Sequence, residues 1–352
     1  MRTRLTADQI NYLNIGLMVV SAALAFRWPF ETFLFAYIFL GPLHYLTEIS
    51  WLHDRRYFTR GTYDPLALVA AALLVTVFSF GLVPGIPPEV IIAICFTAFV
   101  TALVFVVTDS IRMRVLVTVL SAPAGAGLAT LPAAGNVFSV FLPTIIHVFV
   151  FTGVFILVGA LRGRSVSGML SLAVFLGIAV VVVGARAAPA GYRASEYARS
   201  AYGEVTAQGT FTGGFMALNY LLLTGLNMHD FGVAQTTAEQ FVAGINAFLY
   251  QHPMALSLMV FIAFAYLYHY LNWFSKTSVI RWNDMSRARL AAVVLLWVGS
   301  VVLYAYDYVV GFQWLFFLSF CHVLLEFPLN HITFMSLGRE IGALARARRV
   351  QG

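Results

Sequence analysis

The sequence predicts an all-α, polytopic membrane protein: a bundle of about ten transmembrane helices forming a single domain over residues 1–352. Three observations predict this fold. The chain is 61% hydrophobic and only 10% charged, whereas charged residues make up about a quarter of a soluble protein. Apolar runs of about 18 residues or more recur from end to end, and each can cross about 30 Å of hydrocarbon. The basic residues lie between these runs rather than in one patch.

Breaks in hydropathy give the candidate spans in order, with boundaries set by glycine, proline and charged residues. The predicted spans are 10–28, 30–53, 64–84, 88–108, 113–132, 137–161, 167–186, 253–274, 288–306 and 311–333. The first apolar run, which follows two arginines and ends in SAALA, also has the pattern of a signal peptide. We interpret it as a retained first helix.

The basic residues indicate the orientation of the spans. With a cytoplasmic N-terminus, the ten spans leave 17 of the 21 basic residues inside and four outside. This is the asymmetry expected when the spans are assigned correctly. Adding or removing one span would place many of these basic residues on the opposite side and remove the asymmetry. We therefore expect a cell-membrane protein with both termini in the cytoplasm, and the net charge of +6 requires no nucleic-acid partner. The four outside residues are Arg27, Arg186, Arg193 and Arg199.

The longest stretch between predicted spans, 187–252, is expected to form an extracytoplasmic cap. It contains a polar segment, GYRASEYARSAYGE, and a moderately apolar one, FMALNYLLLTGL. We interpret the apolar segment as an interfacial or re-entrant piece; a further pair of short spans is the alternative.

Two spans carry the same pattern of ionisable residues, H-x3-E-x4-H. Ionisable groups at membrane depth are costly and are therefore candidates for function. A spacing of four residues places the first histidine and the glutamate on one helix face, which suits a shared metal ion. On an ideal helix, the third histidine is expected to lie about 180° around the axis and roughly 13 Å along it from the first histidine. In the second copy, Pro328 could break the helix and change this relation. The copies are His44, Glu48 and His53, and His322, Glu326 and His331.

Two further histidines, His147 in PTIIHVFVFTG and His269 in AYLYHYLNWF, lie inside spans. On the predicted topology their spans run in the same direction as those of the repeated motif. We therefore expect four parallel helices to carry an imidazole in one layer, roughly 15 to 24 Å below their outer ends. With the two glutamates, this layer has the ligands for two first-row metal ions. The alternative for any single histidine is a hydrogen bond across a helix interface.

The third histidines of the two motifs are weaker candidates. His53 lies beside Asp54 and Arg55 at the expected cytoplasmic edge, and His331 lies beside Asn330 at a similar level. A role as metal ligand or proton gate competes there with an interfacial salt-bridge cluster.

Other polar residues are expected to support the fold. His229 and His252, in the cap, are interpreted as structural or turn residues. Threonines in spans usually bond to their own helix, so only Asn272 is expected to support the nearby His269. The two cysteines are expected to be small buried side chains rather than a disulfide or a zinc motif. These threonines and cysteines are Thr47, Thr144, Thr152, Cys95 and Cys321.

The leading hypothesis is a membrane metalloenzyme that uses two iron ions to activate O₂ and oxidise a hydrophobic substrate. A lipid, an isoprenoid or a carotenoid-like molecule from the bilayer is the expected substrate, and an electron donor is the expected partner. Zinc and copper are alternative metals. Glu48 and Glu326 are expected to be catalytic as well as ligands. The expected metal ligands are His44, Glu48, His147, His269, His322, Glu326, His53 and His331.

Three other functions are alternatives. The first is an intramembrane zinc hydrolase of a lipid, with a glutamate as general base. The second is a haem-binding electron-transfer protein, and the third is an ion or proton transporter. The histidine boxes of membrane fatty-acid desaturases and alkane hydroxylases, H-x3-H and H-x2-H-H, are missing. The motifs of microbial membrane carotenoid-cleaving oxygenases do not align with this sequence either, and no phosphate-binding loop or serine-hydrolase elbow is present.

Overall fold

The computed structural model describes residues 5–208, 210–228 and 237–351, and within these ranges it contains helices and no strand. Nine of the helical stretches described are long and apolar enough to cross a membrane. They are formed by α1 (Ala7–Arg27), α2 (Pro29–Leu34) with η1 (Phe35–Leu40) and α3 (Gly41–Asp54), α5 (Pro88–Val107), α6 (Ile111–Ala129), α7 (Pro132–Asn136) with η3 (Val137–Phe151) and α8 (Thr152–Gly163), α9 (Val166–Gly184), α13 (Pro253–Ser275), α15 (Arg287–Tyr306) and α16 (Tyr308–Gln351).

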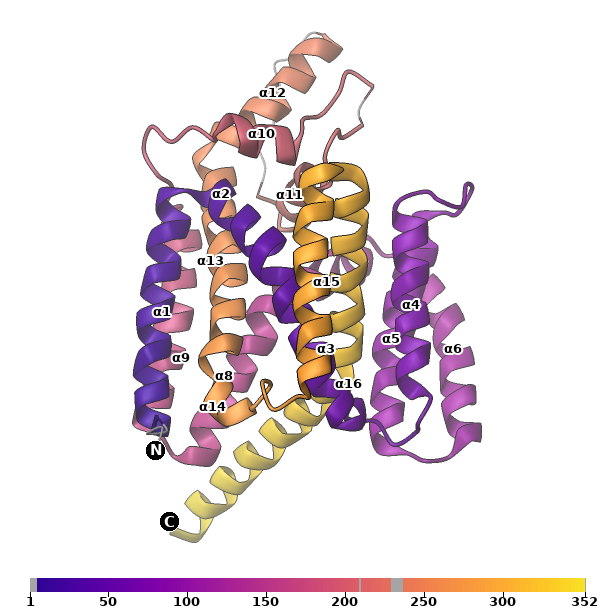
Figure 1. The fold of residues 1–352 in the computed structure, drawn as a ribbon, viewed down its shortest axis with the longest axis vertical. Helices are drawn as coiled ribbons and strands as arrows, with labels where there is room; N and C mark the ends of the chain where they lie inside the picture. Colours follow the sequence, from indigo (N-terminus) through magenta and orange to yellow (C-terminus); the bar gives the residue numbers. More distant parts are fainter. Residues whose placement is uncertain (1–4, 209, 229–236, 352) are drawn as a thin grey trace.

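The predicted span 64–84 is shorter than expected. It corresponds to α4 (Asp64–Ser79), a helix of 16 residues. The helix ends early because the residues that follow favour a turn: Gly81 and Gly85 adopt φ angles of +63° and +81°, a region that side chains with a Cβ rarely enter. At about 1.5 Å per residue, α4 extends roughly 24 Å. It nevertheless runs alongside α5 through the height of the bundle (Figure 1).

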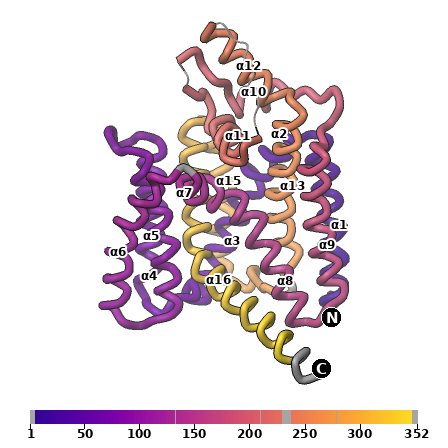
Figure 2. The backbone as a smooth tube through the Cα atoms, turned by 180° about the vertical axis from the view of Figure 1, so that it is seen from behind, coloured from indigo at the N-terminus to yellow at the C-terminus, as the bar shows by residue number. Residues whose placement is uncertain are grey.

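The helices form an inner group and a peripheral lobe. The inner group consists of α3, η3 with α8, α13 and α16, which run in the same direction, from the end near the cap to the end near the termini (Figures 1 and 2). On one side, α1 and α9 pack against α13, while α15 packs against α3 and α16. The lobe consists of α4, α5 and α6, and it contacts the rest of the bundle mainly through α16.

Two of the spans contain π-helical segments, in which the turns are wider than in an α-helix. The first, η1, directly precedes α3, and the second, η3, contains Pro143 and His147. Proline lacks the N–H that an α-helix requires and clashes with the preceding turn, so a departure from α geometry is expected around it. Widened turns of this kind often occur at functional sites, and His147 lies on one of them.

The last helix, α16, is longer than the predicted span 311–333 and continues through Pro328 to Gln351. Pro328 therefore does not end the helix. Figure 1 shows that the C-terminal half of α16 slants beneath the bundle, as expected of a helix bent near a proline.

The described parts of segment 187–252 lie at the end of the bundle opposite to both ends of the chain (Figure 1). Its described helices are α10 (Glu196–Tyr202), α11 (Gly214–Gly225) and α12 (Ala238–Gln251). None of these three is long enough to cross a membrane. Glu31 at the start of α2 holds the segment in place: its carboxylate accepts hydrogen bonds from the Tyr192 hydroxyl (2.6 Å) and the Ser195 backbone N–H (2.8 Å).

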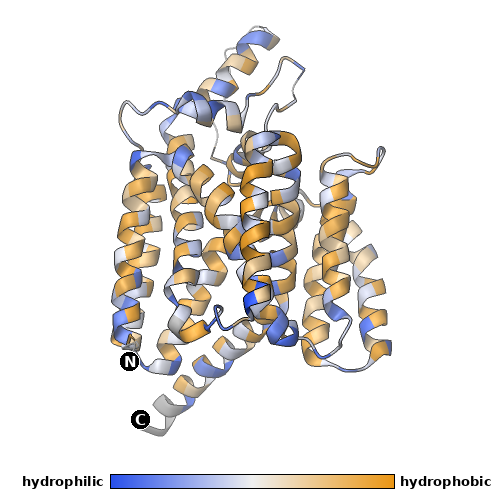
Figure 3. Ribbon diagram, viewed as in Figure 1, coloured by the Kyte–Doolittle hydropathy of each residue, from blue (hydrophilic) through white to orange (hydrophobic). Residues whose placement is uncertain are grey.

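Hydrophobic residues cover the helices along most of their length, and hydrophilic residues gather toward the two ends of the bundle (Figure 3). At the end near the termini, two ion pairs connect the start of α4 with the α5–α6 junction. Arg114 contacts Asp64 at 2.8 Å, and Arg60 contacts Asp109 at 2.9 Å. The Arg60–Asp109 pair is exposed to water at this rim, whereas Arg114 and Asp64 are largely shielded and neutralise each other.

Candidate metal centre

Four histidines from four different spans meet inside the inner helix group. His44 comes from α3, His147 from η3, His269 from α13 and His322 from α16, and each side chain is buried. Going round the group, the ring centroids of His44 and His269 are 4.8 Å apart, and those of His269 and His147 are 5.0 Å apart. The ring centroids of His147 and His322 are 4.8 Å apart, and those of His322 and His44 are 5.3 Å apart. We call these four residues the histidine cluster.

Within the cluster, the imidazole nitrogens face one another in two pairs. The Nε2 atoms of His147 and His322 are 3.0 Å apart, and those of His44 and His269 are 3.1 Å apart. Two imidazole ligands of one ion, each bound at about 2.0–2.1 Å, lie about 3.0–3.4 Å from each other. Each pair therefore has the spacing of two ligands on one ion. Among the described residues, the ligand atoms of His44, His269 and His322 also lie within 4.8 Å of one another.

The two glutamates of the repeated motif occupy different positions around the cluster. Glu48 Oε2 lies 3.1 Å from Nε2 of His44, the same nitrogen that faces His269. Glu326 Oε2 lies 3.2 Å from Nδ1 of His147, a histidine outside its own motif. A carboxylate on the outer nitrogen of an imidazole fixes the orientation and tautomer of metal-binding histidines. The two copies of the sequence motif therefore do not form two equivalent sets of contacts around the cluster.

Thr152 supports the cluster, contrary to our expectation that the threonines in spans bond to their own helices. Its Oγ1 lies 2.9 Å from Nδ1 of His269 and so holds the outer nitrogen of that ring. Thr47 and Thr144 do bond to carbonyl groups of the preceding turn. No local pattern in the sequence indicates this difference, because the partner of Thr152 is 117 residues away. Asn272 forms no hydrogen bond with His269 in the described structure; its Oδ1 accepts a hydrogen bond from the Tyr268 hydroxyl at 3.5 Å.

Aromatic side chains pack directly against the cluster. The ring of Tyr45 stacks on His322 with centroids 4.3 Å apart, and its hydroxyl lies 2.6 Å from that of Tyr270. The Trp273 indole meets the edge of His44, and its N–H donates to Thr47 Oγ1 at 3.0 Å. Packing of this kind restricts the imidazoles to one orientation, which a metal site requires.

The third histidines of the repeated motifs lie outside the cluster, so two of the eight predicted ligands are not brought to it. The His53 side chain is 65% exposed and lies near Asp54 at 3.7 Å. His331 bonds to the carbonyl of Phe99 at 2.9 Å and packs against its ring. The reason is the helix itself: nine residues advance the chain by roughly 13 Å and half a turn, and α16 stays helical through Pro328.

His252 and both cysteines have no part in the cluster. His252 caps the N-terminus of α13, where its Nδ1 accepts from the Met254 N–H at 3.3 Å. Cys95 and Cys321 are free and buried. His229 lies outside the described residues.

Several polar groups in and near the cluster are buried without a hydrogen bond of standard geometry. They are Nδ1 of His44, His147 and His322, Oε2 of Glu326, and the side-chain amide of Asn330, which follows Glu326 by one helical turn. Buried polar atoms in proteins nearly always have a partner. These groups, together with the paired imidazoles, fit a centre that takes up an ion or ordered water.

A cavity of about 280 Å³ lies against the cluster. Its lining combines ionisable side chains with apolar ones. The ionisable residues include His44, Glu48, His269 and Glu326, and the apolar ones are Trp51, Phe155, Trp273, Ile280 and Leu329. The centre therefore adjoins a small space in which an apolar part of a ligand can lie next to the imidazoles.

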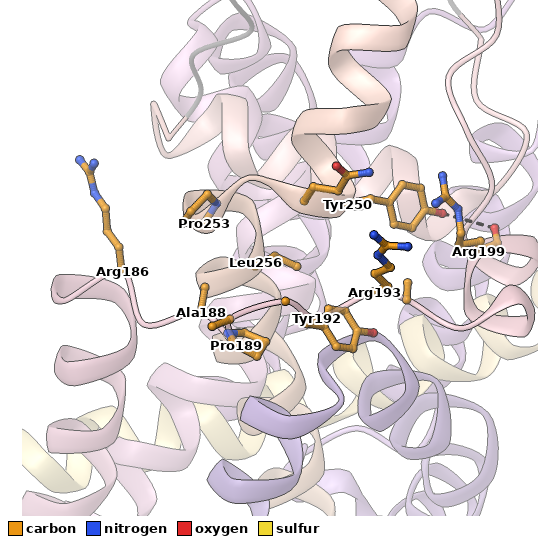
Figure 4. Close-up of a pocket in the computed structure, with 13 residues that line it drawn as sticks. Arg186, Ala188, Pro189, Tyr192, Arg193, Arg199, Tyr250, Pro253 and Leu256 are labelled. Carbon is orange, nitrogen blue, oxygen red and sulfur yellow. Dashed lines mark hydrogen bonds between the residues drawn. The ribbon is translucent and has the colours of Figure 1, made fainter.

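A second cavity, of about 730 Å³, lies at the cap end and has a different chemistry. Figure 4 shows that Arg193 lies between Tyr192 and Tyr250, whereas Arg186 projects away from them. Arg199 packs over the Tyr250 ring and pairs with Glu204 at 3.3 Å. No histidine, cysteine or carboxylate lines this cavity within the described ranges, so it is not a metal site.

The chain matches no family model, no curated protein and no solved structure. Its function must therefore be argued from the site. The feature that carries the argument is a group of four buried imidazoles with two acidic side chains in contact with it.

Proposed function

We propose that this chain is a multi-pass membrane metalloenzyme that holds two iron ions in the histidine cluster and oxidises a hydrophobic substrate with O₂. The observation that carries this proposal is the pairing of the imidazoles, with Nε2 atoms 3.0 and 3.1 Å apart inside an apolar bundle. Each pair would hold one ion. Neutral imidazole mixed with carboxylate suits iron, and two carboxylates offset part of the charge that hydrocarbon cannot solvate.

The residues divide into ligands and supporting groups. The first ion would be held by His147 and His322, and the second by His44 and His269, with Glu48 as a further ligand. Glu326 lies within reach as a ligand or as the partner of His147 Nδ1. Thr152 would keep His269 oriented toward the second ion, as outer hydrogen-bond partners do for metal-binding histidines.

The surroundings of the cluster favour oxidation of an apolar substrate. Iron supplies the activation of O₂ when it is bound. The protein's own contribution is a cavity lined by Trp51, Phe155 and Trp273, which would exclude water from the reacting centre and hold an apolar chain beside it. Glu48 is placed to hold a proton at its carboxylate during the reaction, because it lies both in the cavity wall and 3.1 Å from His44.

We also propose that α4 crosses the membrane as a tenth span, with both termini in the cytoplasm of a cell-membrane protein. This topology leaves 17 of the 21 basic residues inside. The ion pairs of Arg60 and Arg114 support it, because they hold the start of α4 at the same end of the bundle as the α5–α6 junction.

A zinc hydrolase of a lipid is the second candidate. The contact between Glu48 and His44 favours it, since a glutamate beside a zinc-bound water can act as general base. A haem is less compatible with the cluster. A porphyrin held between two histidines must pass between their rings, and the paired Nε2 atoms here are in direct contact. An ion or proton transporter would use the same residues without a bound transition metal.

Elemental analysis of the purified full chain, together with an absorption spectrum, tests the proposal. We expect close to two iron ions per chain and no Soret band. Zinc in place of iron would favour the hydrolase, and a Soret band would favour electron transfer. If no stoichiometric transition metal is bound when all four histidines are intact, the proposal is wrong and the transporter remains.

A further inference from the structure

The cavity beside the cluster adjoins a groove at the end of the bundle near the N-terminus. The groove has a volume of about 690 Å³ and lies between the start of α1, the end of α8, the start of α9 and the end of α13. These elements lie together near the N-terminus in Figure 2. The cavity and the groove share three lining residues: Phe155, Asn272 and Lys276. We call these three residues the neck.

Lys276 is unusual among the residues of the neck. It is the only lysine in the sequence, and it follows the last residue of α13. It is partly buried and forms no ion pair with any residue that the structure describes. Burial lowers the pKa of its ammonium group to about 8, so the group is still mostly protonated at neutral pH. A partly desolvated cation without a counter-ion favours the binding of an anion.

The described charged residues of the cavity and the groove form no ion pair with Lys276. Glu48 and Glu326, which line the cavity with it, contact His44 and His147 instead. Asp8 is already engaged by the hydroxyl groups of Ser165 and Ser167. Arg164 also lines the groove and adds positive charge rather than removing it. Lys276 therefore has no anionic partner among the described residues that line the groove and the cavity.

We infer that the cavity and the groove together bind a single-chain amphiphile, with its acidic head group at Lys276 and its apolar chain directed through the neck toward the histidine cluster. The carboxylate of a fatty acid and the phosphate of a single-chain lipid share this chemistry. This inference depends on the proposed function only where it makes the amphiphile the substrate of the metal centre. The binding itself needs no metal ion.

The dimensions and the lining residues favour one chain. A cavity of about 280 Å³ has room for part of one alkyl chain but not for the two chains of an ordinary membrane lipid. Trp51 and Trp273 line the cavity, so an apolar chain that enters it will contact indole rings. These two tryptophans also provide a signal for binding.

Quenching of tryptophan fluorescence by brominated lipids tests this inference. The probes are a dibrominated long-chain fatty acid, its methyl ester and a brominated single-chain alkyl phosphate, added to the full chain in detergent. We expect the wild type to bind the acid about tenfold or more tightly than the ester, as expected for a hydrogen bond to a charged group. A stronger preference for the alkyl phosphate would identify phosphate as the head group.

Four variants give the test its specificity. Lys276→Gln is expected to bind the acid and the ester equally, while Lys276→Arg retains the preference for the acid. Arg186→Gln removes one positive charge at the opposite end of the bundle and is expected to bind like the wild type. Replacing Trp51 and Trp273 together with Phe is expected to abolish the saturable part of the quenching, which locates the bound chain in the cavity.

The inference is overturned if the wild type binds the acid and the ester alike, or if Lys276→Gln keeps the preference. It is also overturned if quenching survives the double tryptophan replacement. The same titration on chelator-treated protein separates this inference from the proposed function. An acid preference in metal-free protein supports the binding site even where elemental analysis finds no iron, and bound iron without an acid preference supports the metal centre alone.

Discussion

Helices α13 and α6 are both long and apolar enough to cross a membrane, yet their surroundings are opposite. In α13, 83% of the apolar segment is buried inside the protein, compared with 11% in α6. The highest mean hydropathy of the nine candidate spans belongs to α5, the neighbour of α6 in the peripheral lobe. Hydropathy therefore identifies the segments that can cross a membrane but does not indicate which of them lie in the core.

The polar residues of the two helices explain the difference. Helix α13 contains His269, Tyr268 and Tyr270, whose polar groups bond to residues of other helices. Most of α6 faces outward with apolar side chains such as Val119 and Leu120, which are 62% and 58% exposed. In a bilayer an apolar side chain gains little by facing protein rather than lipid, whereas a polar group must find a partner inside. Polar residues therefore mark the core of this bundle.

The largest effect is expected from replacing a histidine of the cluster. His322→Ala removes one of two paired imidazoles, so we expect bound metal to fall by half or more, with loss of any oxidase activity. His53→Ala, at an exposed position of the same repeated motif, is the matched control and should leave the metal content unchanged. Elemental analysis of both variants checks this. Full metal retention in His322→Ala would exclude the ligand set proposed here.

A large effect on stability is expected from Leu258→Ala in α13, where the side chain is 2% exposed. The substitution leaves a cavity in packed protein and should lower the free energy of unfolding by about 2–5 kcal/mol. Leu120→Ala, in the outward face of α6, should change it by less than about 0.5 kcal/mol. Thermal unfolding in detergent measures both. Equal losses would mean that α6 is as closely packed as α13 and would remove the contrast between core and lobe.

The spans and the polar core could be predicted from the sequence, because both follow from local patterns. Nine of the predicted spans correspond to helices long enough to cross a membrane, whereas 64–84 was predicted too long because its terminal glycines adopt left-handed conformations. The four histidines of the cluster were selected because each is an ionisable residue deep in an apolar run. The structure brings these four together with Glu48 and Glu326.

Other features of the site depend on contacts between distant residues and could not be predicted. The bond from Thr152 to His269 and the contact of Glu326 with His147 join different helices. No spacing along the chain encodes the rotation of one helix relative to another. The neck at Lys276 was missed for the same reason, although its position as the only lysine, close to the end of a span that carries a cluster histidine, was a signal that could have been used.

A moderate effect is expected from removing the hydroxyl group that orients His269. Thr152→Val keeps the volume of the side chain but deletes its bond to Nδ1, so metal affinity should fall by about 10–100-fold. Thr101→Val, which deletes a similar bond to Thr118 in the peripheral lobe, should leave the affinity unchanged. Competition with a metal chelator measures both variants. If the two behaved alike, the hydroxyl of Thr152 would have no specific role in the site.

The smallest effect is expected from Gly125→Ala in α6. A Cβ at this position would lie 2.9 Å from the Cα of Ala93 in α5, so the two helices must separate slightly. We expect a loss of about 1 kcal/mol in the free energy of unfolding, the lower end for overpacking, because a peripheral pair of helices can yield toward lipid. Gly127→Ala, with no atom within 4 Å, is the control and should be neutral or slightly stabilising. A loss in Gly125→Ala as large as that in Leu258→Ala would show that the lobe is rigidly packed. Its low burial would then reflect its position at the edge of the bundle and not a looser fit between α5 and α6.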